Sequence, residues 1–142
     1  MAEKSGDQQA LAQVHNILGI LARSQDDFDL ACQHLGQSLE LAKVLGDSSA
    51  QIAALNNLAL AHSACGRLEQ AIQLTETALA LCVSRGDRHR EAALHNNLAD
   101  LFHAAGQNEA AMPHLKQAVT IFAEIGAEAG APQPEIWKLV EW

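Results

Sequence analysis

The sequence is poor in aromatic residues and proline, and it has no long apolar run. Only 4% of its 142 residues are aromatic, none is tyrosine, and three are proline. β-branched residues do not form runs, so strands are not expected. No apolar stretch reaches the roughly 18 residues of a membrane span, and the polar start MAEKSGDQQ lacks the apolar core of a signal peptide. Alanine and leucine, both strong helix formers, dominate, which predicts an all-α domain.

The net charge indicates which partners to expect, and the cysteines indicate the cellular compartment. A net charge of −8 repels phosphate backbones, so we expect no nucleic-acid partner, and the lack of a long apolar run predicts no membrane partner. The cysteines, Cys32, Cys65 and Cys82, are odd in number and lie apart. This favours small buried thiols in a reducing cytoplasm over disulfides, and a cytoplasmic localisation is predicted.

Histidine is frequent, with seven residues, but its positions do not predict a metal site. His15 and His95 are equivalent in the repeat described below, as are His34 and His114, which marks them as framework positions. His62 lies three residues before Cys65, a spacing compatible with metal ligation, but no further ligands accompany the two.

A repeat of 40 residues is the main signal. The dipeptide Gly-Asp occurs at residues 6–7, 46–47 and 86–87. The same register holds asparagine at 16, 56 and 96, leucine at 18, 58 and 98, and alanine at 31, 71 and 111. Agreement at many positions without a gap predicts three repeats in one domain. They occupy about residues 6–45, 46–85 and 86–125 of a domain spanning 1–142.

Each repeat is predicted to form two helices. The aspartate of Gly-Asp is a good N-cap because its carboxylate accepts backbone N–H groups, and the glycine supplies the left-handed conformation that ends the preceding helix. A second break falls at Asp26, Gly66 and Gly106, and aspartate tolerates positive φ better than most residues. The predicted helices span about residues 8–23, 28–45, 48–64, 68–85, 88–104 and 109–125.

Small residues stand where the two helices of a repeat have to approach closely, since bulky side chains would overpack the contact. They form triplets with one spacing: Gly19, Ala31, Ser38; Ala59, Ala71, Ala78; and Ala99, Ala111, Ala118. This pattern resembles tetratricopeptide repeats (TPRs), in the longer form of kinesin light chain-like proteins and bacterial regulators. The resemblance covers residues 7–125. It implies a right-handed superhelical α-solenoid of three helix hairpins.

In that family the first helices of the repeats line a concave groove. The resemblance places Asn57 and Asn97 there, where an amide offers donors and an acceptor to a peptide backbone. The alternative is a purely structural asparagine ladder that joins adjacent repeats. The groove residues expected beside them, one and two turns further on, are Leu60, Ser63, Asp100 and His103. This neutral to acidic mixture favours a basic or neutral ligand.

Residues 126–142 fall outside the repeats. Gly126 to Pro134 is predicted to be a linker, and Glu135 to Trp142 a short amphipathic helix that caps the last repeat. In the alternative interpretation, the tail contacts another copy of the chain. A homodimer would then form through the array ends or through Trp137 and Trp142.

The sequence shows no catalytic arrangement, no phosphate-binding glycine loop and no cofactor motif, so we expect neither an enzyme nor a cofactor. The expected function is that of a protein-interaction module that binds a peptide or a segment of a partner protein in the groove. The alternatives are a self-associating scaffold and a regulatory fragment of a larger bacterial regulator or signalling protein.

Overall fold

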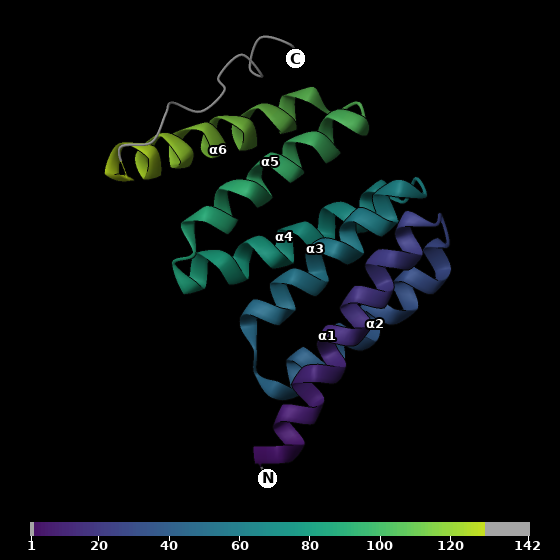
Figure 1. Cartoon of the computed structure of the whole chain (residues 1–142). Helices are drawn as coiled ribbons and strands as arrows, with labels where there is room; N and C mark the ends of the chain where they lie inside the picture. The colour runs from purple at the N-terminus through teal and green to yellow at the C-terminus, as the bar shows by residue number, and fades with distance from the viewer. Residues whose placement is uncertain (1, 130–142) are drawn as a thin grey trace. The chain divides into compact units, whose positions relative to one another are not determined.

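The computed structural model describes residues 2–129, and the regular structure in this range is entirely α-helical. The helices are α1 (Ala2–Ser24), α2 (Phe28–Leu45), α3 (Ser48–Ala64), α4 (Leu68–Arg85), α5 (Arg88–Ala104) and α6 (Asn108–Ala129) (Figure 1). The prediction of an all-α fold is confirmed, and the four central helices have the predicted bounds. No helix in the described part of the chain is both long and apolar enough to cross a membrane.

The first helix begins earlier than predicted. The Gly6-Asp7 step lies inside α1, which begins at Ala2, so the prediction that Asp7 caps a helix is wrong. Residues 2–4 are alanine, glutamate and lysine, which favour helix strongly enough to carry it through one glycine. Gly6 therefore does not end a helix, although it keeps the register of the repeat.

The sixth helix is longer than predicted. It passes through Gly126 and ends at Ala129, so the predicted linker does not begin at residue 126. Glycine in a helix interior costs only about 1 kcal/mol relative to alanine, and the good helix formers after it outweigh that cost. The rest of the predicted linker and the predicted capping helix lie outside the described residues.

The other two Gly-Asp steps separate helices as predicted. Gly46 has a φ of 64° and its N–H reaches back to carbonyls in the last turn of α2. The carboxylate of Asp47 then accepts a hydrogen bond from the N–H of Ala50 at 3.1 Å and starts α3. Gly86 and Asp87 repeat this arrangement between α4 and α5. One dipeptide thus ends one helix and caps the next.

The breaks within the repeats use the same left-handed conformation. Gly66 and Gly106 have φ values of 85° and 77°, and Asp26 has a φ of 62°, the one positive value at a non-glycine residue in the described range. These three positions are equivalent in the repeat, so the backbone shape is kept where the residue type is not.

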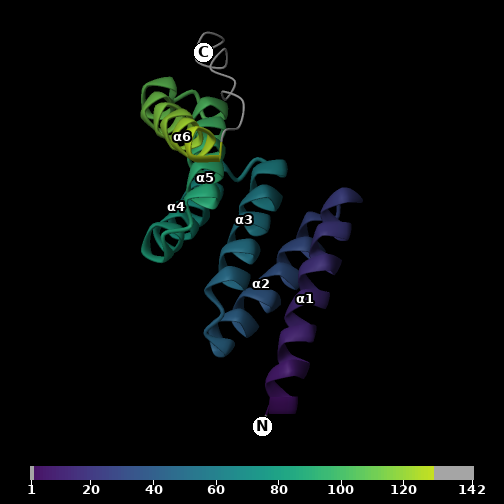
Figure 2. The same cartoon turned by 60° about the vertical axis from the view of Figure 1, so that its left-hand side comes forward.

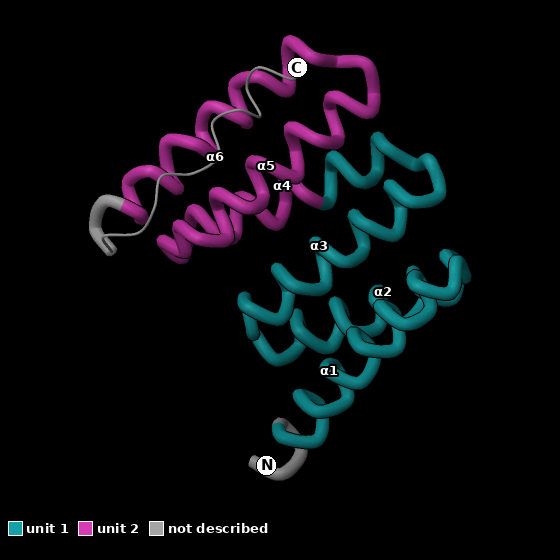
Figure 3. Tube along the Cα trace, turned by 45° about the horizontal axis from the view of Figure 1, so that its top comes forward, with its two compact units in different colours: residues 1–74 teal, residues 75–142 magenta. Residues whose placement is uncertain are grey.

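The chain divides into two compact units, residues 1–74 and 75–142 (Figure 3). The first unit holds α1, α2, α3 and the start of α4. Within it α2 packs against both α1 and α3 (Figure 2). The helices α1 and α3 also contact each other. The second unit holds the rest of α4 with α5 and α6, and α5 packs against α6. The repeated element within each unit is a pair of packed helices.

Small residues close the hairpin of α1 and α2. A Cβ atom at Gly19 would lie 2.4 Å from Cγ of Leu35 and 3.3 Å from the carbonyl oxygen of Ala31. Ser38 is buried and donates its hydroxyl hydrogen to the carbonyl of Ala12 at 2.8 Å. The two helices therefore approach closely enough that position 19 has no room for a side chain.

The alanines at the equivalent positions of the later repeats are buried as well. They are Ala59, Ala71, Ala78, Ala99, Ala111 and Ala118. In the second unit Ala99 of α5 packs with Ala111 and Leu115 of α6, and Phe102 covers this cluster. Each hairpin thus has its core where the small residues let the helices meet.

Candidate functional site

The first helices of two consecutive repeats, α1 and α3, bring two asparagines together. Asn57 of α3 donates a hydrogen bond from Nδ2 to Oδ1 of Asn16 of α1 at 2.9 Å, and both side chains are half-buried. The bond joins repeats one and two, as a structural ladder would. The bond uses one of the two N–H donors of the Asn57 amide. It also fixes the direction of the second N–H donor and of the carbonyl acceptor.

The other groove residues predicted in the first unit follow Asn57 along α3. Leu60 and Ser63 are half-buried one and two turns further on. The same register on α1 holds Ile20 and Arg23. Nε of Arg23 is buried and has no hydrogen-bond partner among the described residues. Sequence reasoning missed Arg23, although the 40-residue register relates it to Ser63 and would have found it.

The groove residues predicted in the second unit lie on α5. Asn97 is half-buried, whereas Asp100 and His103 are exposed. Nδ1 of His103 lies 2.7 Å from Oδ1 of Asn108 at the start of α6, so the imidazole is held by the next helix. The six predicted groove residues thus form two sets of three, one on α3 and one on α5.

Two histidine pairs are a feature that sequence reasoning missed. His15 and His34 face each other across α1 and α2 with their Nδ1 atoms 3.0 Å apart. His95 and His114 do the same across α5 and α6 at 2.9 Å. The ring centroids are 5.2 Å apart in both pairs. Periodicity marks these positions as equivalent, but only the packing of helix on helix shows that they touch.

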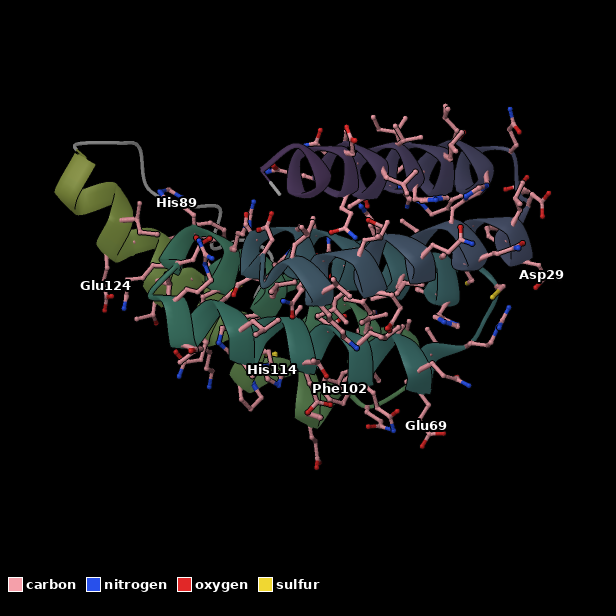
Figure 4. The ribbon with its side chains drawn as sticks, turned by 90° about the horizontal axis from the view of Figure 1, so that it is seen from below. Asp29, Glu69, His89, Phe102, His114 and Glu124 are labelled. Carbon is pink, nitrogen blue, oxygen red and sulfur yellow. The ribbon has the colours of Figure 1, made fainter. Side chains whose placement is uncertain are left out.

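Burial favours the neutral form of both rings in the second histidine pair. Burial lowers the pKa of His95, and neighbouring His114 lowers it further, against the opposing effect of Glu91. Burial also lowers the pKa of His114, opposed by Glu76. The ring of Phe102 stacks on His114 with centroids 5.6 Å apart (Figure 4). A neutral pair shares a single proton between the facing Nδ1 atoms, so one ring donates and the other accepts.

In the first unit, the thiols of Cys32 and Cys65 each contact a polar side chain. Sγ of Cys32 is 3.9 Å from Nε2 of His62, and Sγ of Cys65 accepts a hydrogen bond from Nε of Arg67 at 3.0 Å. Burial raises the pKa of the Cys32 thiol and lowers the pKa of His62. Across the described residues, no three histidine, cysteine or acidic side chains are placed to hold a metal ion. These contacts join the side chains in pairs.

The repeat has a known family. Residues 8–82 and 50–124 both match the tetratricopeptide repeat family. The chain belongs to this family. TPR domains are generally protein–protein interaction modules that act as non-catalytic scaffolds. No curated protein matches the chain.

Solved structures show the same fold. The TPR domain of Arabidopsis FLU has a TM-score of 0.75 at 19% identity, over 84% of this chain and 98% of that one. BtubC (BKLC) from P. vanneervenii has a TM-score of 0.78 at 20% identity, over 94% of this chain and 55% of the other. A putative kinesin light chain with nearly identical TPR-like repeats from Podosopora anserina has a TM-score of 0.71 at 24% identity, over 83% and 57%. The chain spans just over half the length of the last two, and these identities establish the fold alone.

Proposed function

We propose that this TPR domain binds an extended peptide segment of a partner protein along the face formed by its first helices. The observation that carries the proposal is the bond from Asn57 to Asn16, which holds the Asn57 amide in one orientation on that face. A fixed amide presents a donor and an acceptor to a peptide unit without losing further rotamer freedom, which favours binding. Asn97 would do the same on α5.

The side chains next to these amides favour a basic or neutral ligand. Leu60 and Ser63 are uncharged, and Asp100 is an exposed acid. In contrast, α1 has Arg23 at the position equivalent to Ser63, so the preference for a basic ligand applies to α3 and α5. Main-chain hydrogen bonds to the amides would supply affinity, and the alternating side chains of the peptide would supply specificity. The reducing cytoplasm remains the proposed location, because Cys32, Cys65 and Cys82 are all free thiols.

A selection from a random peptide library on the immobilised full chain tests this function. The enriched peptide is then synthesised and titrated against the wild type and against the double variant N57A/N97A. We expect the double variant to bind at least about tenfold more weakly, because two amide contacts to the peptide are each worth about 1 kcal/mol. Circular dichroism checks that helicity is kept.

The double variant Q37A/Q117A is the matched control. Gln37 and Gln117 are exposed amides on α2 and α6 at equivalent positions of the repeat. Their removal should leave the affinity for the selected peptide unchanged. Equal affinity of N57A/N97A and wild type would assign the asparagines to the structural ladder alone and overturn the groove.

Self-association is the second candidate function. The alternative interpretation of the sequence places it at the array ends or at Trp137 and Trp142, and both tryptophans lie outside the described residues. The observation that favours it is an exposed apolar face on α1, on a different side of the helix from Asn16.

A further inference from the structure

The first helix exposes a continuous apolar face. Leu11, Val14, Leu18 and Leu21 are 46%, 47%, 40% and 52% exposed. Their spacing of three, four and three residues places them on one side of α1. Ile17 adjoins this face and is 56% exposed. The four residues from Leu11 to Leu21 are called the α1 face below.

The repeat shows what these positions do elsewhere in the chain. The equivalents of Val14, Leu18 and Leu21 are Ala54, Leu58 and Ala61 in α3, and Leu94, Leu98 and Leu101 in α5, and all six are buried. The helix α3 packs against α2, the second helix of the preceding repeat. Positions that are buried in α3 and α5 are therefore exposed on α1, as an apolar face without a partner among the described residues.

The α1 face also lacks charge. No lysine, arginine, aspartate or glutamate occurs between Asp7 and Arg23, in a chain whose net charge is −8. A charged partner would find nothing to pair with on this face. Two copies of the chain, each with a net charge of −8, would not bring like charges together if they associate through this face. The absence of charge thus favours a copy of the chain itself.

We propose that the α1 faces of two copies pack against each other in antiparallel orientation and form a homodimer. The spacing reads the same in both directions, so a twofold axis near Asn16 places Leu11 opposite Leu21 of the second copy. The same axis places Val14 opposite Leu18 of the second copy. This is the self-complementary contact that a twofold interface requires. Because one helix per copy gives a small interface, association is reversible and depends on concentration.

Sedimentation equilibrium of the full chain over a range of concentrations tests the dimer. The wild type should approach the mass of two chains, and V14E should raise the dissociation constant at least tenfold by burying an unpaired charge. The double variant V14E/L18K should restore association, because the carboxylate introduced at position 14 then faces the ammonium group introduced at position 18 of the second copy, at both ends of the contact. V14K/L18K, with like charges opposed, should remain monomeric.

Two further variants separate this contact from general hydrophobic adhesion. Val44 and Val83 are 72% and 56% exposed on α2 and α4. V44E and V83E should leave the dissociation constant unchanged, and circular dichroism checks that every variant stays helical. A wild type that is monomeric at all concentrations overturns the proposal. Growth beyond two copies, or a V14E/L18K variant as monomeric as V14K/L18K, overturns the antiparallel contact in favour of head-to-tail stacking.

Discussion

At the scale of single residues, the contact between α1 and α2 depends on one missing side chain. We predict that Gly19→Ala destabilises the protein, although alanine is the better helix former. A Cβ at this position would lie 2.4 Å from Cγ of Leu35, which is fully buried, and 3.3 Å from the carbonyl oxygen of Ala31. Overpacking costs about 1–3 kcal/mol, which outweighs the gain of about 0.5–1 kcal/mol from replacing glycine in a helix. Urea denaturation measures the difference.

Gly36 provides the control for this prediction. It lies inside α2, and a Cβ there would meet nothing within 4 Å. Gly36→Ala should therefore raise the free energy of unfolding by about 0.5–1 kcal/mol. If both substitutions raise the free energy of unfolding, the inference that position 19 has no room for a side chain is wrong.

The histidine pair of the second unit makes stability depend on pH. The pKa values of His95 and His114 lie below the ordinary value of 6.5, so the folded protein binds protons more weakly than the unfolded chain. Their contribution to stability is then complete above pH 6.5 and decreases as the pH falls below that value. We predict a lower free energy of unfolding at about pH 5 than at about pH 7.5.

The protein itself supplies the control variant for this pH effect. The middle repeat has Leu55 and Leu74 at the positions equivalent to His95 and His114. In H95L/H114L the free energy of unfolding should decrease less on acidification than in the wild type. The difference is the part that protonation of these two histidines contributes. An equal loss in wild type and variant, measured by urea denaturation at both pH values, would show that the pair does not titrate on unfolding.

These residues show where sequence reasoning stops at this scale. The 40-residue register identifies Gly19 as a small position and the histidines as equivalents, because both follow from spacing along the chain. It does not show that His95 touches His114, or that Nε of Arg23 is buried without a partner among the described residues. Such contacts depend on the angle and depth at which two helices pack, and spacing along one helix does not fix these.

At the scale of the helices, aspartate caps mark where α2, α3 and α5 start. Asp47→Ala should lower the free energy of unfolding by about 1 kcal/mol, since the Asp47 carboxylate accepts a hydrogen bond from the N–H of Ala50. Asp47→Asn should retain most of the stability, because its amide oxygen accepts the same bond. Asp7→Ala is the control at the equivalent position, and it should change stability by less than about 0.5 kcal/mol because Asp7 lies inside α1. Thermal unfolding followed by circular dichroism distinguishes the three.

The helices also show which boundaries a sequence determines. The limits of α2 to α5 were predictable because each break has a left-handed residue, followed by an aspartate cap before α2, α3 and α5. The two outer limits were not. Gly6 and Gly126 keep the register of the repeat, but both lie within helices because the residues around them favour helix. At Gly6 this preference outweighs the same Gly-Asp dipeptide that separates helices at residues 46–47 and 86–87.

At the scale of the whole molecule, net charge separates the two proposed modes of association. Two copies that each carry −8 repel one another, and salt screens this repulsion, because the Debye length falls from about 10 Å at 0.1 M to about 3 Å at 1 M. The proposed dimer contact is uncharged, so screening removes the repulsion and leaves the contact intact. A peptide with net positive charge is instead attracted to the chain, and salt weakens that attraction.

We therefore predict opposite salt dependences for the two processes. Raising the salt concentration from about 0.05 M to about 0.5 M should lower the dissociation constant of the dimer and raise that of a basic groove peptide. Sedimentation equilibrium and calorimetric titration measure the two constants on the same protein. Because V14E weakens the dimer but leaves α3 and α5 unchanged, its peptide titration should show the salt effect on the groove alone. If the peptide instead binds more tightly at high salt, apolar contacts such as those of Leu60 dominate binding. The charge of the chain then does not determine which peptide binds.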